Sequence, residues 1–256
     1  MKVVILCGGM GTRLKEETEF KPKPLVNVGG MPILWHIMKI YSHYGHKEFI
    51  LPLGYRGEMI KEFFVNFNWM ANDFSLDLKD KKVEIHNNHK NEDWTIHFVD
   101  TGLESGTALR LYKIKELLKD EEDFMLTYGD GVADIDMNKL VEFHKQEGSV
   151  ATLTGIQTAS RFGVIETDEN KVTSFVEKPF GNDRINGGFF VFNKRIFDHI
   201  DNSNVMLVGH TLPKLANTGD LSIYKHDGFW HCMDTYRDYL KLNEIWKNNP
   251  KWKIWE

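Results

Sequence analysis

The spacing of hydrophobic positions changes repeatedly along the chain and marks its expected elements. Residues 3–7 (VVILC) form a short run of mostly branched apolar side chains, typical of a strand buried on both faces. Residues 32–45 (PILWHIMKIYSHYG) show the spacing of a helix that Gly45 is expected to end. Residues 47–54 and 57–67 repeat this order of strand and helix. Such alternation predicts right-handed βαβ units on a mainly parallel sheet.

The alternation continues into the middle of the chain and then changes character. Further strands are expected at residues 82–88, 95–102, 123–131 and 149–157, and helices at residues 107–118 and 137–148. Later segments are richer in strands: a strand, polar turn and strand at residues 163–179, strands at 187–193 and 221–233, and a closing amphipathic helix at 235–247. The predicted fold is α/β, with a Rossmann-like, mainly parallel central sheet flanked by helices and a β-rich C-terminal elaboration. Without a linker or repeat, residues 1–256 are expected to form one domain.

Composition narrows the class of protein without identifying its chemistry. The apolar share of 41% and charged share of 27% over 256 residues are those of an ordinary globular protein. A formal net charge of −5 gives no reason to expect a nucleic-acid partner. The chain contains no apolar stretch long enough to span a bilayer, and the apolar run at its start is too short for a signal peptide. With only two cysteines, we expect a cytoplasmic protein without a membrane partner.

The first distinctive motif is LCGGMGTRL, residues 6–14, directly after the first expected strand. A Rossmann fingerprint needs a third glycine at the position of Leu14, which disfavours a dinucleotide-dependent dehydrogenase. A Walker loop needs G-K-[ST], and this chain has G-T-R. Both standard phosphate loops are therefore excluded by particular residues.

The same motif still has the properties of a phosphate site. Its glycines let the backbone N–H groups approach an anion closely. Arg13 offers a forked cationic donor, and Lys23 lies between two prolines that are expected to hold an extended segment and to preorganise its ammonium group. The alternative is a glycine turn at a strand end beside ordinary surface cations.

Two aspartates follow apolar strands farther along the chain. Asp130 stands in TYGDGVAD and Asp234 in HCMDTYRD. Ligands of open α/β sheets bind at the carboxyl ends of strands, where both residues are expected. Taken singly, Asp130 could cap a turn and Asp234 could be a helix N-cap. Together they could hold one Mg²⁺ against a triphosphate, because hard cations prefer carboxylate oxygens.

These motifs together resemble the sugar-phosphate nucleotidylyltransferases. LCGGMGTRL followed by KPKPLV matches the G-G-x-G-T-R-L…K-P-K signature of that family. TYGDGVAD, FVEKP, INGGFFVF, GFWHCMDTYRD and WKIWE are similar to its cytidylyltransferases for sugar 1-phosphates, and the resemblance spans nearly the whole chain. It implies that CTP and a sugar 1-phosphate, with glucose 1-phosphate as the first acceptor to consider, give a CDP-sugar and pyrophosphate. The product would serve polysaccharide biosynthesis, such as that of capsule or O-antigen.

The resemblance also implies roles for individual residues. Catalytic roles fall to Arg13, Lys23 and Lys178. Nucleotide contacts fall to Leu6, Gly8, Gly9, Gly11, Thr12, Arg13, Lys23, Arg110 and Asp130. The Mg²⁺ ligands would be Asp130 and Asp234, and the acceptor contacts would be Glu177, Lys178, Asn186 and Gly187. Residues 1–160 would form the nucleotide-binding core and residues 161–256 the acceptor-binding part of a homo-oligomeric enzyme.

Two stretches depart from the family pattern. TALRL, residues 107–111, replaces T-G-G-R-L and places the side chains of Ala108 and Leu109 where close backbone approach to base or ribose is expected. VGHTLPKL, residues 208–215, replaces W-E-x-x-P-L near the acceptor. One alternative is therefore a cytidylyltransferase for another sugar phosphate or a non-sugar phosphate. A second alternative, from another class, is a catalytically silent nucleotide-binding regulatory module.

Overall fold

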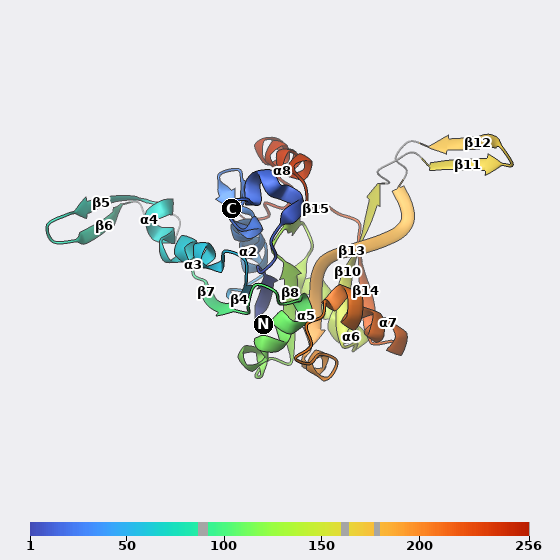
Figure 1. Ribbon diagram of the computed structural model, residues 1–256, viewed down its shortest axis with the longest axis horizontal. Helices are drawn as coiled ribbons and strands as arrows, with labels where there is room; N and C mark the ends of the chain where they lie inside the picture. Colours follow the sequence, from blue (N-terminus) through green and yellow to red (C-terminus); the bar gives the residue numbers. More distant parts are fainter. Residues whose placement is uncertain (87–91, 160–163, 177–179, 256) are drawn as a thin grey trace.

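A seven-stranded sheet forms the centre of the computed structural model, which describes residues 1–86, 92–159, 164–176 and 180–255 (Figure 1). Its strand order is β14-β10-β13-β8-β1-β4-β7. These strands are β1 (Val3–Leu6), β4 (Glu48–Leu53), β7 (Thr95–Asp100), β8 (Asp123–Tyr128), β10 (Ala151–Ala159), β13 (Phe180–Asn193) and β14 (Leu221–His226). β13 runs antiparallel to β8 and β10, and the other pairings are parallel. The predicted α/β class is thus confirmed.

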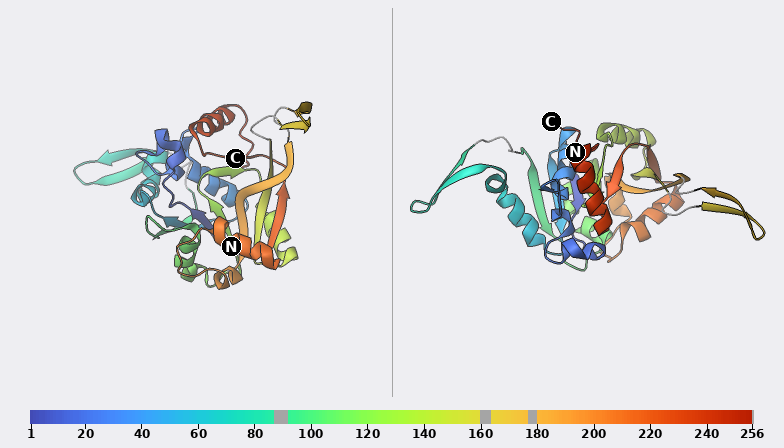
Figure 2. Two further views of the ribbon diagram at one scale, coloured as in Figure 1. Left: turned by 45° about the vertical axis from the view of Figure 1, so that its right-hand side comes forward. Right: turned by 90° about the horizontal axis from the view of Figure 1, so that it is seen from above.

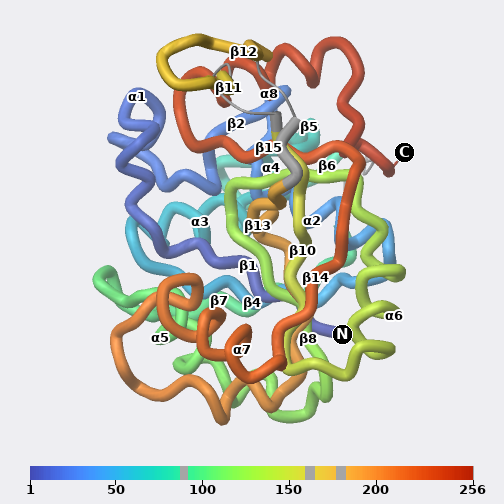
Figure 3. Tube along the Cα trace, turned by 90° about the vertical axis from the view of Figure 1, so that its right-hand side faces the viewer, coloured from blue at the N-terminus to red at the C-terminus, as the bar shows by residue number. Residues whose placement is uncertain are grey.

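Alternate residues of the central strands enter two cores, one on each face of the sheet. In β1, Val3 and Ile5 belong to one core and Val4 and Leu6 to the other. The helices and single turns are α1 (Lys15–Thr18), α2 (Ile33–His43), α3 (Gly57–Val65), α4 (Phe67–Ala71), α5 (Thr107–Lys113), α6 (Met137–Glu147), α7 (Leu212–Thr218), α8 (Tyr236–Asn248), η1 (Thr12–Leu14), η2 (Lys23–Leu25), η3 (Lys115–Leu118), η4 (Lys194–Asp198) and η5 (Leu207–Thr211). Helix α2 packs in the first core and α5 and α7 in the second, while α6 lies against β13 and β14 (Figure 3).

Smaller strand pairs surround the central sheet. They are β2 (Asn27–Val28) with β3 (Met31–Pro32), β5 (Asp73–Asp77) with β6 (Lys82–His86), β9 (Gly131–Ala133) with β15 (Trp230–Cys232), and β11 (Val164–Asp168) with β12 (Lys171–Val176). The β5–β6 and β11–β12 hairpins project from opposite ends of the molecule (Figures 1 and 2). They expose large apolar side chains, including Leu78 and Phe175.

The structure differs from the sequence-based expectations at several elements. The strand expected at residues 82–88 is present as β6, but it pairs with β5 outside the central sheet. Strand β5 is a further difference: it lies in a segment where no strand was expected, although residues 73–77 (DFSLD) alternate polar and apolar side chains, and all five are exposed. The helix expected at residues 107–118 divides at Ile114 into α5 and η3. The strand expected at residues 221–233 divides into β14 and β15, which belong to different sheets.

The C-terminal tail packs on α2 through aromatic rings. Trp252 is fully buried, and its indole N–H donates to Nδ1 of His36 at 3.4 Å. The other ring nitrogen of His36, Nε2, donates to the carbonyl of Val28 at 2.8 Å. Burial lowers the pKa of His36 to about 4, so the ring is neutral near pH 7. Among the described residues, no helix is both long and apolar enough to cross a membrane.

Candidate active site

The loop after β1 carries its glycines to the carboxyl edge of the sheet. Because β1 lies between β4 and β8, residues 8–11 leave the sheet near its centre. Gly11 has a φ of 63°, and a side chain there would press on Thr18 and Lys23. The hydroxyl of Thr18 donates to the carbonyl of Gly11 at 3.0 Å and to that of Leu14 at 2.7 Å. These bonds fix the path of the loop backbone.

Arg110 supports the same loop from below. Its buried guanidinium donates through Nη2 to the carbonyls of Gly8 and Leu103, both at 3.0 Å. Through Nη1 it donates to the carbonyl of Leu53 at 2.8 Å and to the hydroxyl of Thr101 at 2.6 Å. A side chain on Gly8 would collide with the guanidinium. Arg110 thus ties together three segments that meet beneath the loop.

A first cavity of about 580 Å³ lies along the loop. Every residue expected to contact the nucleotide lines it: Leu6, Gly8, Gly9, Gly11, Thr12, Arg13, Lys23, Arg110 and Asp130. Its remaining lining residues are Cys7, Met10, Pro24, residues 103–107, Tyr128, Gly129, Asn204 and Met206. The motif residues of the N-terminal part therefore share one concave surface.

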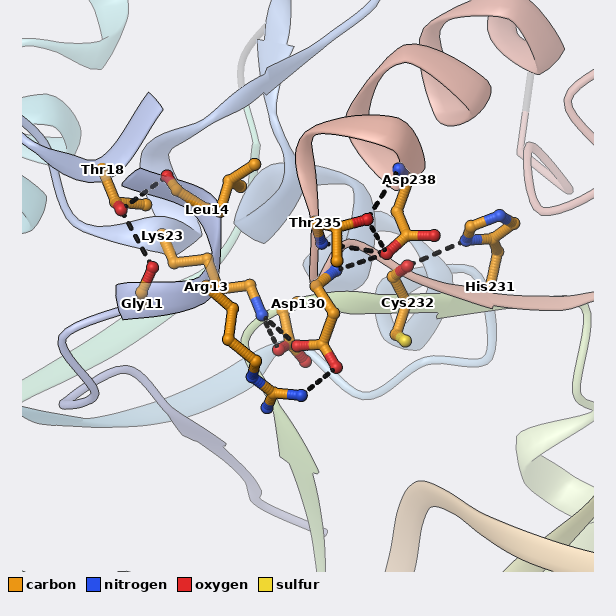
Figure 4. Close-up of polar contacts among 11 residues, drawn as sticks. Gly11, Arg13, Leu14, Thr18, Lys23, Asp130, His231, Cys232, Thr235 and Asp238 are labelled. Carbon is orange, nitrogen blue, oxygen red and sulfur yellow. Dashed lines mark hydrogen bonds and ion pairs between the residues drawn. The ribbon is translucent and has the colours of Figure 1, made fainter. Parts of the chain in front are cut away.

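The two predicted metal ligands meet at one end of this cavity and share the ammonium group of Lys23 (Figure 4). Lys23 Nζ lies 2.5 Å from Asp130 Oδ2 and 2.8 Å from Asp234 Oδ1. Arg13 Nη1 lies 2.9 Å from Asp234 Oδ2. The Lys23 side chain is 12% exposed, whereas that of Arg13 is 75% exposed. Lys23 is thus the enclosed cation of the group and Arg13 the exposed one.

Antiparallel pairing explains why the two aspartates meet. Cys232 of β15 lies opposite Gly131 of β9. The backbone N–H of Met233 donates to the carbonyl of Asp130 at 2.8 Å, which extends the pairing by one residue. The next residue is Asp234, just past the paired strands, and its carboxylate meets that of Asp130 at the ammonium of Lys23. A long-range strand pair therefore places the acidic pair.

The N-cap of α8 is Thr235 and not Asp234. The Thr235 hydroxyl accepts the backbone N–H of Asp238, and the Asp238 carboxylate accepts the backbone N–H of Thr235. The capping interpretation of Asp234 is therefore wrong, because a capping box already closes the helix start and Asp234 directs its carboxylate to Lys23 and Arg13.

The charge of Lys23 is retained despite its burial. Burial acts to lower its pKa, but the charge of Asp130 and hydrogen bonds to both aspartates raise the pKa above its usual value. Lys23 begins the short turn η2 instead of an extended segment. Pro22 keeps the extended conformation, and Pro24 fits near the start of the turn, where its missing N–H is not needed.

A second cavity of about 600 Å³ adjoins the first. Both cavities are lined by Arg13, Tyr128 and Asp130, and the second is also lined by Thr127, Gly131, Thr158, residues 185–189, Trp230, Cys232 and Asp234. The predicted acceptor residues Asn186 and Gly187 are among these. Gly187 accepts the indole N–H of Trp230 through its carbonyl at 2.7 Å. The predicted acceptor residues Glu177 and Lys178 lie outside the described residues.

The departure at Ala108 and Leu109 does not face the first cavity. Ala108 is buried in the second core, and neither side chain lines the first cavity. Gly106, Thr107 and Arg110 line it instead. The start of α5 turns these two positions toward the protein interior, so their side chains do not narrow the first cavity.

The departure at residues 208–215 likewise lies away from both cavities. These residues form parts of η5 and α7, and Leu212 and Leu215 pack in the second core. Among the described residues that line the two cavities, none comes from residues 208–215. The segment just before them does: Asn204 accepts the N–H of Gly106 at 2.6 Å and donates to the carbonyl of Glu104 at 3.0 Å. This part of the chain therefore borders the first cavity.

Tyr128, Asn204 and Met206 line the cavities but were not among the predicted site residues. Tyr128 lines both cavities, and burial raises its pKa to about 12. Its place beside the TYGD aspartate could have indicated it. Asn204 and Met206 come from a connection with no local motif, so only long-range contacts identify them.

The donor set fits a hard divalent cation that also takes ligands from a nucleotide. Asp130 and Asp234 can already share one cation, since both contact the ammonium of Lys23. In the part of the chain that the structure describes, no group of three or more His, Cys, Asp or Glu side chains could hold a metal. Mg²⁺ is commonly bound by one or two carboxylates with phosphates and water, and two carboxylates satisfy that pattern.

Comparison with known proteins agrees with the geometry. The Nucleotidyl transferase family matches residues 2–249. The chain is 48% identical to glucose-1-phosphate cytidylyltransferase of Salmonella typhi and 44% identical to a probable glucose-1-phosphate cytidylyltransferase of Bacillus subtilis, with 100% of both chains covered in each case. The crystal structure of HddC from Yersinia pseudotuberculosis superposes with a TM-score of 0.71 at 25% identity, covering 96% of this chain and 99% of HddC. The chain therefore belongs to the nucleotidyl transferase family.

Proposed function

We propose that this chain is an Mg²⁺-dependent cytidylyltransferase that transfers the cytidylyl group of CTP to a sugar 1-phosphate, glucose 1-phosphate first. The observation that carries the proposal is the junction of the two cavities at Arg13, Tyr128 and Asp130. A nucleotide in the first cavity and an acceptor phosphate in the second would meet beside the acidic pair. The identity with glucose-1-phosphate cytidylyltransferases over the full chain supports the choice of both substrates.

The reaction needs positioning and charge neutralisation more than proton transfer. An oxygen of the acceptor phosphate forms a bond to the α-phosphorus of CTP. The bond from the α-phosphorus to the oxygen that bridges the α- and β-phosphates breaks, and pyrophosphate leaves with that oxygen. The attacking oxygen is already anionic, so no general base is required. Lys23 and Arg13 would orient and neutralise the phosphates. When bound by Asp130 and Asp234, Mg²⁺ would neutralise charge on the phosphates.

The remaining assignments follow the two cavities. We place the triphosphate along the glycine loop, and the sugar beside Asn186 and Gly187, which line the second cavity. Glu177 and Lys178 are proposed to contact the sugar hydroxyls and the acceptor phosphate. Residues 1–160 would then carry most of the nucleotide site and residues 161–256 most of the acceptor site.

We also propose a cytoplasmic homo-oligomer. Nucleoside triphosphates are cytoplasmic substrates, and both Cys7 and Cys232 are free thiols. In the hairpins, Leu78 is 82% exposed and Phe175 is 65% exposed, and burial of such side chains against another copy would be favourable. Light scattering coupled to size-exclusion chromatography tests this assembly: an oligomer supports it, and a monomer at micromolar concentration contradicts it.

A pyrophosphate-release assay that crosses four nucleoside triphosphates with a panel of phosphorylated acceptors tests the function. We expect activity with CTP and glucose 1-phosphate that requires Mg²⁺. Activity with CTP and a different sugar phosphate, or a non-sugar phosphate, would overturn the acceptor and retain the cytidylyl transfer. Nucleotide binding without pyrophosphate release for any acceptor would instead support a silent regulatory module.

A further inference from the structure

Lys23 occupies the position between the two carboxylates that a divalent cation would need. Its Nζ lies 2.5 Å from Asp130 Oδ2 and 2.8 Å from Asp234 Oδ1, and Arg13 contacts the other oxygen of Asp234 at 2.9 Å. Among these four side chains, two negative charges face two positive ones. A divalent cation approaching alone would therefore meet a cluster whose charges are already balanced.

The backbone of Lys23 is fixed while its ammonium lies at the end of a long side chain. The turn η2 closes when the N–H of Val26 donates to the carbonyl of Lys23 at 3.0 Å. On the other side, Asp130 is held by the N–H of Met233. Lys23 also lines the first cavity together with the glycine loop. Its ammonium can thus turn from the carboxylates to an anion in that cavity without moving the backbone.

We infer that Lys23 is an exchangeable counter-ion. Without nucleotide, its ammonium holds the carboxylates of Asp130 and Asp234 together. When the nucleotide and the metal bind, the ammonium moves to the nucleotide phosphates and the metal takes its place between the carboxylates. This inference rests on the proposed function. It makes binding of metal and nucleotide mutually favourable, because the phosphates give the displaced ammonium a new anionic partner. It also makes the metal alone a weak ligand.

Mn²⁺ binding without nucleotide tests the exchange directly. Electron paramagnetic resonance would compare free Mn²⁺ in titrations of the wild type, Lys23→Met and Lys23→Gln. We expect either Lys23 variant to bind Mn²⁺ about tenfold more tightly than the wild type, because no ammonium competes for the carboxylates. The tightening should vanish when Asp130→Asn is added. Equal or weaker Mn²⁺ binding by a folded Lys23 variant overturns the inference.

Lys21 supplies the matched control. It is two residues away, and its ammonium pairs with Glu17 at 3.1 Å instead of with the acidic pair. Lys21→Met removes the same charge, so it should leave Mn²⁺ binding near the wild-type value. An equal tightening in Lys21→Met would show a general charge effect and would overturn the exchange. These titrations contain no nucleotide, whereas failure of the proposed function would show in the pyrophosphate assay of the wild type.

A measurement on the wild type tests the exchange without depending on whether the variants fold. Nitrogen NMR of the lysine ammonium groups should show one resonance, assigned to Lys23, that moves when Mg²⁺ and CTP are added together. Mg²⁺ alone at the same concentration should leave it in place. Unchanged ammonium resonances with CTP and Mg²⁺ bound would contradict the exchange.

Discussion

The two ends of the first cavity each contain a cation that is largely enclosed by protein, but the two cations have different partners. At one end, Lys23 contacts the carboxylates of Asp130 and Asp234. At the other end, the four hydrogen bonds of Arg110 go to three backbone carbonyls and one hydroxyl. Carboxylates can exchange one cation for another, whereas carbonyls that are paired inside the protein cannot leave without disrupting the fold. The end with Lys23 is therefore suited to binding an exchangeable cation, and the end with Arg110 is suited to holding the loop in place.

The buried charge of Arg110 would also act on a nucleotide in the cavity. Burial lowers the pKa of the Arg110 guanidinium, but arginine remains charged at any physiological pH. Its charge lies directly beneath Gly8, whose neighbours in the loop are proposed to contact phosphate. Arg110 would therefore favour an anion in the cavity without touching it through an exchangeable bond.

The largest expected effect is at the acidic end. Asp130→Asn keeps the shape of the side chain and removes one of the charges that would hold Mg²⁺, so kcat should fall by roughly a thousandfold while the thermal unfolding temperature stays close to the wild type. Steady-state pyrophosphate release over a range of Mg²⁺ concentrations measures it. Asp120→Asn, at an exposed position, is the control. Near-normal rates at saturating Mg²⁺ would show that Asp130 is not a metal ligand.

Substitution of Arg110 should lower the free energy of unfolding, because its hydrogen bonds go to the protein and not to a ligand. Arg110→Met removes the guanidinium hydrogen bonds to the carbonyls of Gly8, Leu53 and Leu103 and empties a buried polar position, so we expect the free energy of unfolding to fall by about 3 kcal/mol. Urea denaturation followed by circular dichroism measures the loss. Arg237→Met, at an exposed position of α8, should change it little. A fully stable Arg110 variant with weak CTP binding would mean that Arg110 acts on the ligand and not on the loop.

Substitutions at the neighbouring Gly8 and Gly9 distinguish the contact of the loop with Arg110 from the flexibility of the loop backbone. A side chain on Gly8 would meet the Arg110 guanidinium, whereas one on Gly9 would meet open space. Gly8→Ala should therefore lower the free energy of unfolding by about 2 kcal/mol and raise the KM for CTP. Gly9→Ala should have a smaller effect on stability. Equal stability of the two variants in thermal denaturation would show that the loop can move away from Arg110.

Sequence motifs were sufficient for the predicted residues of the first cavity. The loop at residues 6–14 and Asp130 follow strand ends, so the strand pattern already places them at one edge of the sheet, and the KPKP motif identifies Lys23. Their proximity to Asp234 required the pairing of β15 with β9, and nothing in either short strand specifies that partner. The contacts of Asn204 with the segment around Gly106 are equally distant in sequence.

The structural misses have one physical origin as well. Periodicity does not say what covers an apolar face: residues 73–77 alternate polar and apolar side chains, yet β5 pairs with β6 outside the central sheet and is exposed throughout. The same limit applies to Ala108, which an apolar helix start could direct either into the cavity or into the core. The packing of α5 against η5 decides that direction.

His36 extends the comparison to a buried basic group without an anionic partner. Its nitrogens contact a carbonyl and an indole N–H, and its pKa falls to about 4, whereas Lys23 beside two carboxylates keeps its charge. In the unfolded chain the ring takes up a proton near its ordinary pKa, so the unfolded state gains protons first as the pH falls. Stability should decrease by about 1 kcal/mol from this residue between pH 7 and pH 5.5. Urea denaturation across that range should show a smaller decrease in His36→Gln than in the wild type, and an unchanged one in His43→Gln, at an exposed position of the same helix. An identical pH dependence in His36→Gln would mean that the folded protein accepts the proton on this ring, and that burial without an anion does not by itself remove a charge here.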